Sequence, residues 1–107
     1  MLLEEMTSTE DMMQAGYDSQ ANAISITLAP VEHADRADHV HGRAIVALHD
    51  GHPIELQLLY PDMGVEQPLA AAADRYGLDR GALQAAARSA LAVPDRVVVL
   101  DVLAPSA

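Results

Sequence analysis

One stretch of the sequence, residues 40–60, constrains the fold more than any other. It reads VHGRAIVALHDGHPIELQLLY, with a polar break at His49-Asp50-Gly51-His52 between two apolar runs. Asp-Gly between β-prone runs is a strong hairpin signal, because glycine accepts a positive φ without a Cβ clash. The stretch therefore predicts two antiparallel strands joined by a tight turn at Asp50 and Gly51.

Two loop lengths fit this turn. A three-residue loop, His49-Asp50-Gly51, pairs Val46 with Ile54, whereas a two-residue loop, Asp50-Gly51, sets Val46 opposite Glu55. The longer loop is preferred because it separates apolar from polar side chains. The apolar face then holds Val46, Leu48, Ile54, Leu56 and Leu58, and the other face holds Arg43, Glu55 and Gln57. Ile45 falls on the polar face, so that face is expected to be partly covered.

The remaining elements follow from periodicity and turn residues. Residues 24–28 alternate, with Ile24, Ile26 and Leu28 inward, and predict a first strand. Residues 31–43 read as a polar connection. Two Ala-rich helices are expected at 69–76, ended by Gly77, and at 80–91, capped by Asp79. The β-branched run 96–103 predicts a final strand. The predicted fold class is therefore α+β: a three-stranded antiparallel meander, a two-helix hairpin and a C-terminal strand.

Length and charge bound the organisation and the partners. The 107 residues predict a single domain at 17–103, with an acidic N-terminal arm at 1–16 and a tail at 104–107. A formal net charge of −10 disfavours nucleic acid and anionic membranes as partners. There is no cysteine, no basic n-region and no long apolar run. A soluble cytoplasmic protein, from a bacterium by its all-Arg coding bias, is expected.

A family resemblance rests on two short motifs. The first runs from Tyr17-Asp18 to Leu28, and the second lies in the hairpin. The matching residues are Tyr17, Asp18, Ala21, Ala23, Ile24, Ile26, Leu28, Asp50, Gly51, Ile54, Glu55 and Leu58. Over residues 17 to about 60 the chain resembles the family called domain of unknown function 2283, from which it departs at Asn22, Ser25 and Leu56. The resemblance implies a small β-meander and no catalytic residue or ligand.

The helix pair has an alternative interpretation as a DNA-binding helix-turn-helix. Ala73, Gly77, Leu78 and Leu83 match the small, turn and buried positions of that motif. However, residues 62–94 hold four acids and three arginines, which leaves no basic face for phosphates. An ordinary helical hairpin packed on the sheet is preferred, and no binding of nucleic acid is expected.

Five histidines offer a weak metal hypothesis. His39 and His41 stand two apart on an expected strand, so they would share one face and bind a transition metal with Asp35 or Asp38. No specific ligand spacing supports this, and solvated surface histidines are the preferred interpretation. No cofactor is expected.

The sequence lacks the common catalytic motifs but contains apolar residues that favour association. No serine lies in a GxSxG turn and there is no glycine-rich phosphate loop, so the chain is predicted not to be an enzyme. The continuously apolar Val97, Val98 and Val99, with Ile45 and Leu59, predict an interface. We expect a non-catalytic protein that forms a homodimer or binds a protein partner, with an antitoxin-like or accessory role open. The alternatives are the helix-turn-helix regulator at 69–91 and a small metal-dependent enzyme.

Overall fold

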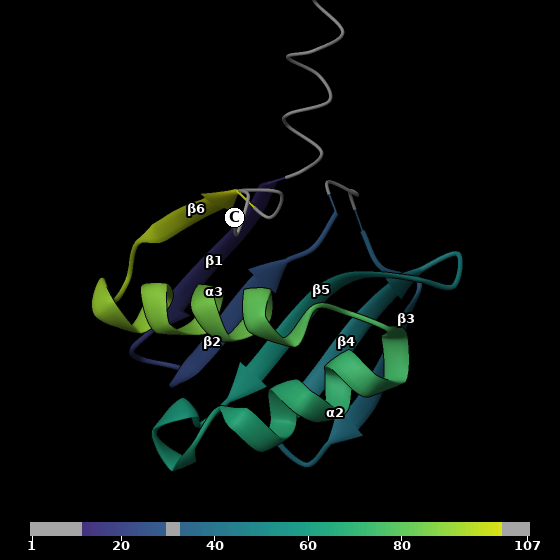
Figure 1. Ribbon diagram of the computed structural model, residues 1–107, viewed down its shortest axis with the longest axis horizontal. Helices are drawn as coiled ribbons and strands as arrows, with labels where there is room; N and C mark the ends of the chain where they lie inside the picture. The colour runs from purple at the N-terminus through teal and green to yellow at the C-terminus, as the bar shows by residue number, and fades with distance from the viewer. Residues whose placement is uncertain (1–11, 30–32, 102–107) are drawn as a thin grey trace, which may run out of the picture.

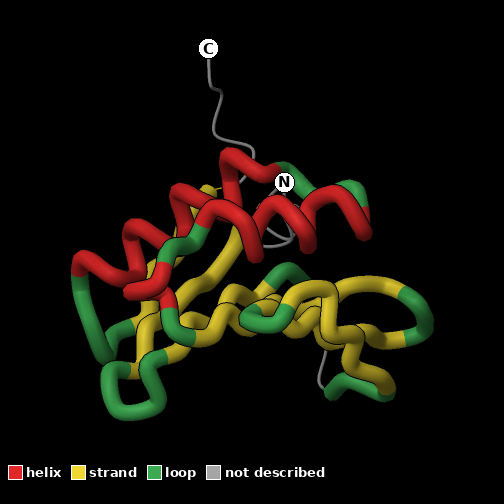
Figure 2. Tube along the Cα trace, turned by 90° about the horizontal axis from the view of Figure 1, so that it is seen from below, coloured by secondary structure: helices red, strands yellow, loops and turns green. Residues whose placement is uncertain are grey.

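Two helices lie on one face of a six-stranded antiparallel sheet (Figures 1 and 2). The computed structural model describes residues 12–29 and 33–101. The chain order is β1 (Met12–Asp18), β2 (Ala23–Thr27), β3 (Arg36–His41), β4 (Ala44–His49), β5 (His52–Leu59), a 3-10 helix η1 (Pro61–Met63), α2 (Glu66–Tyr76), α3 (Arg80–Ala92) and β6 (Val97–Asp101). The strands are ordered β3-β4-β5-β2-β1-β6, so β3 and β6 form the two edges.

The core lies between the helices and the sheet. α2 packs on β3, β4 and β5, and α3 packs on β1, β2 and β6. Branched side chains from the strands meet mostly alanines from the helices, which lets the two layers approach closely. The fully buried members are Ile24, Ile26, Ala44, Val46, Leu56, Leu58, Leu69, Ala72, Ala86, Ala87 and Ala90.

The predicted α+β class is confirmed, but the expected number of strands was too low. β1 uses Met12–Gly16, which had been assigned to an acidic arm, and residues 1–11 lie outside the described residues. β3 was taken for part of the polar connection. β3 is an edge strand with little burial, so its period-two alternation is weak. β1 does alternate, with Met13, Ala15 and Tyr17 inward, but these three residues are a short signal beside the acidic residues that precede them.

The β4–β5 hairpin corrects the preferred loop length. His49 pairs with His52, so the loop has two residues, Asp50 and Gly51, with φ of 53° and 82°. Positive φ at both positions is the geometry of a type I′ turn. A bulge between Ala47 and Leu48 then shifts the register, so Val46 pairs with Leu56 and the preferred pairing of Val46 with Ile54 was wrong. The five expected inward residues are all buried despite the shorter loop.

The helices begin and end close to the predicted positions. α2 starts at Glu66, two residues before Pro68, and ends at Gly77, which has φ 65°. The Asp79 side chain accepts a hydrogen bond from the Ala82 amide at 3.1 Å and caps α3. Neither helix is long and apolar enough to span a membrane, and this finding covers the described residues only.

No helix of the described chain lies on the second face of the sheet. The register defines this open face by two rows that cross all six strands. One row is His39, Ile45, Gln57, Ser25, Gly16 and Val97, and the other is Ala37, Ala47, Glu55, Thr27, Gln14 and Val99. Both rows are polar or small in the middle and end on a valine of β6.

Candidate functional site

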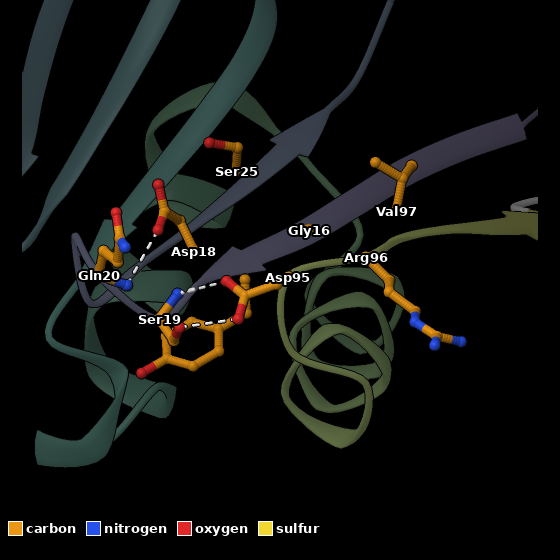
Figure 3. A pocket seen from close by; sticks show the side chains of 9 residues that line it. Gly16, Asp18, Ser19, Gln20, Ser25, Asp95, Arg96 and Val97 are labelled. Carbon is orange, nitrogen blue, oxygen red and sulfur yellow. Dashed lines mark hydrogen bonds between the residues drawn. The ribbon is translucent and has the colours of Figure 1, made fainter.

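A hollow of about 530 Å³ opens where the β1–β2 turn meets the segment between α3 and β6 (Figure 3). Its lining comes from the ends of β1 and β6 and from Ser25 of β2. Gly16 forms part of the floor, where a Cβ would lie 3.4 Å from the Arg96 carbonyl oxygen. The carboxylates that line this hollow come from Asp18 and Asp95.

Both carboxylates already hold the local backbone in place. Asp95 accepts hydrogen bonds from the Ser19 amide at 2.9 Å and the Ser19 hydroxyl at 2.8 Å (Figure 3). Asp18 Oδ1 accepts from the amides of Gln20 and Ala21 at 3.0 and 3.2 Å, which caps the turn. The Ser19 amide donor, followed by the hydroxyl, lowers the pKa of Asp95 from its usual 3.8. The carboxylates therefore act as tethers between turns.

The first resemblance motif belongs to the same network. The Tyr17 hydroxyl donates to Asn22 Oδ1 at 2.9 Å, and Asn22 Nδ2 donates to Asp62 Oδ1 at 2.8 Å. Asn22 has φ 53°, a conformation that asparagine tolerates better than most residues. These residues join the β1–β2 turn to η1, so the motif has a structural role here. The roles of Ser19 and Asp95 were not found from sequence, since 76 positions separate them.

The two weak metal candidates lie on opposite faces of the sheet. His39 pairs with Ile45 on the open face, whereas a register shift after His39 pairs His41 with the buried Ala44. The expectation that they share a face was therefore wrong, because a bulge breaks the period-two pattern. His41 Nδ1 accepts a hydrogen bond from the Arg43 amide at 3.1 Å.

A second histidine group lies at the β4–β5 turn. Nδ1 of His49 is 3.8 Å from a carboxylate oxygen of Asp35, and the rings of His33 and His49 stand edge to face at 5.9 Å. Within residues 12–29 and 33–101, no group of three or more His, Cys, Asp or Glu side chains is arranged to hold a metal ion.

The helix pair shows no concentration of positive charge. α3 exposes Arg80 and Arg88, while Glu66 and Asp74 are exposed on α2. Leu83 and Ala73, two of the residues that match a helix-turn-helix, are buried in the core between helices and sheet. These positions serve the packing of an ordinary helical hairpin.

The predicted interface residues divide between the two faces. Ile45 and Leu59 are partly buried on the open face. Ile45 pairs with the polar Gln57, and Leu59 lies two residues after Gln57 on β5. Val97 and Val99 lie on the same face at the β6 edge, with 70% and 56% of their surface exposed. Val98 lies on the other face and packs against the core. Ile45 and Val97 share a row, but three strands lie between them, so the five residues do not form one patch.

The two edges of the sheet differ sharply. β3 carries Arg36, Asp38 and His39 and a bulge, and Asp38 is held by the Tyr76 hydroxyl and by Arg75 Nε at 3.4 Å. The hydrogen bond to Asp38 raises the pKa of Tyr76. Charges, bulges and covering helices are the usual protection of an edge strand. β6 has no charged residue and no bulge between Val97 and Leu100, although α3 packs on its inward face. No described strand pairs with its outer edge.

Comparisons with known proteins add no relative. No family model, no curated protein and no solved structure matches the chain.

Proposed function

We propose that this chain is a non-catalytic protein that acts by association, and that the β6 edge with Val97 and Val99 is its contact surface. The supporting observation is the contrast between the edges: β3 is charged and bulged, whereas β6 is regular and is apolar from Val97 to Leu100. An edge strand presents unpaired N–H and C=O groups, so an unprotected edge favours strand addition.

The hydrogen bonds within the hollow support the proposal that the chain is non-catalytic. Its two carboxylates accept hydrogen bonds from the turn that they hold, and both lie on exposed residues. Figure 3 shows the Arg96 side chain directed away from Asp95. Catalytic acids and bases are usually found in buried surroundings, whereas Asp18 and Asp95 are both exposed.

Site-specific photo-crosslinking in the source cell tests the association. A photoreactive phenylalanine derivative replaces Val99, and the matched control carries it at Ala85, which is exposed on α3. Covalent adducts of defined mass from position 99, absent from position 85, are expected. Adducts from neither position, or equal yields from both, would reject the β6 edge as a contact surface.

A further inference from the structure

We infer that the partner at the β6 edge is a second copy of this chain, paired antiparallel through β6 about a two-fold axis. This inference rests on the proposed function and names the partner of the same surface. Two six-stranded sheets would then join edge to edge into one continuous sheet. A two-fold interface is isologous, so the strand must be complementary to itself.

The five residues of β6 meet this requirement in one register. Two antiparallel copies related by a two-fold axis perpendicular to the sheet always place one residue opposite itself. With Val99 at that position, all of Val97–Asp101 is paired, because Val98 faces Leu100 and Val97 faces position 101. Shifting the centre to Val98 shortens the pairing within β6 to Val97–Val99.

The Val99-centred register also extends the existing layers. Val98 and Leu100 are the inward residues of β6 and pack against the core beside α3. Their mutual pairing continues this apolar layer across the axis. On the open face, the two exposed Val99 side chains would cover each other, where directly opposed Cβ atoms lie about 5 Å apart.

The charge of the segment around β6 favours a second copy as the partner, although the whole chain is strongly negative. The chain carries −10, but the segment from Arg96 to Asp101 holds one arginine and one aspartate and is formally neutral. Two copies can therefore meet at β6 without concentrating like charges at the contact. The edge needs no basic partner to neutralise it.

The absence of cysteine permits a sharp test of the register. In a Val99→Cys variant the two thiols are directly opposite, within the Cα separation of about 4.4–6.8 Å that a disulfide requires. In the matched Val97→Cys variant, the thiols are four residues apart along the strand, or about 14 Å. Mild oxidation should therefore give disulfide-linked dimers of Val99→Cys and leave Val97→Cys as monomers.

Sedimentation velocity at micromolar concentration gives the second readout. The wild-type chain should sediment as a species of twice its 11.4 kDa mass. Val99→Lys should sediment as a monomer with unchanged circular dichroism. Met63→Lys, which alters an apolar residue on η1 that is more exposed than Val99, should stay dimeric.

The outcomes separate this inference from the proposed function. A wild-type chain that stays monomeric, or equal disulfide yields from the two cysteine variants, overturns self-pairing at Val99. If position 99 then cross-links to a different protein, association at β6 stands and the partner is not a second copy. If Val99→Lys fails to fold, the comparison of the cysteine variants still decides the result.

Discussion

At the scale of single residues, positive φ marks the turns that hold the sheet together. Among the described residues other than glycine, Asn22, Asp50, Tyr60 and Asp95 adopt it. Asparagine and aspartate are enriched in this region, but tyrosine is not. Tyr60 is held by its neighbours, because its amide donates to the Asn22 carbonyl and its carbonyl accepts from the Arg43 guanidinium at 3.0 Å.

Gly51 provides the first prediction. Its φ is 82° and no atom lies within 4 Å of an added Cβ, so replacement there tests the backbone alone. Gly51→Val should lower the free energy of unfolding by on the order of 1–2 kcal/mol, measured by urea denaturation. Gly42→Val is the control, since Gly42 has equal space and no positive φ. Equal losses for both variants would contradict the type I′ turn.

Asp95 provides a prediction about pH. Because hydrogen bonds from Ser19 lower its pKa below 3.8, the ionised form stabilises the folded state. This contribution is fully present above the unfolded pKa of about 3.9 and is lost as the pH falls through the lower folded pKa. The melting-temperature gap between wild type and Asp95→Asn should therefore narrow on acidification from about pH 6 to about pH 2. A constant gap would show that the charge of Asp95 plays no part.

At the scale of elements, α3 depends on its N-cap. Asp79 accepts the Ala82 amide hydrogen bond at 3.1 Å, and no other acid lies in the first turn. Asp79→Ala should destabilise the protein by about 1 kcal/mol in thermal or urea unfolding, whereas Asp79→Ser should retain most of the stability. Asp74→Ala, an exposed aspartate inside α2, is the matched control. A similar loss in that control would contradict a capping role.

Which elements could be predicted from sequence depended on how strongly each one buries its side chains. β2, β5 and both helices bury regular stripes, and their patterns identified them. β3 was missed because an edge strand buries little. β1 was missed because its inward residues are only Met13, Ala15 and Tyr17, of which Ala15 is small. The tether between Ser19 and Asp95 could not be found, since no local pattern links positions so far apart.

The bulge at Ala47 and Leu48 is a further limit on sequence reasoning. If the two strands pair without a bulge, only a three-residue loop separates the apolar from the polar side chains. The sequence therefore favours the longer loop. One extra residue in β5 keeps the same residues on the apolar face with a two-residue turn, although Val46 pairs with Leu56 and not with Ile54. The predicted buried residues were therefore confirmed, although the predicted loop length was wrong.

At the scale of the whole molecule, charge and self-association oppose each other. Each chain carries −10, so two copies repel beyond their neutral contact strands. Raising salt from about 0.1 M to about 1 M shortens the Debye length from about 10 Å to about 3 Å. The dimer should therefore become tighter with added salt, as measured by sedimentation equilibrium. Weaker association at high salt would indicate instead that attraction between opposite charges holds the assembly together.

The pairing of β1 with β6 bears on how the chain folds. Met12 pairs with Asp101, although almost the whole described chain separates them, whereas β3, β4 and β5 pair with their immediate neighbours. Closing so long a loop has a large entropic cost before any contact offsets it. The local hairpins should consequently form early and the β1–β6 ladder late. A ribosome would have to release nearly all of this domain before its last strand could dock.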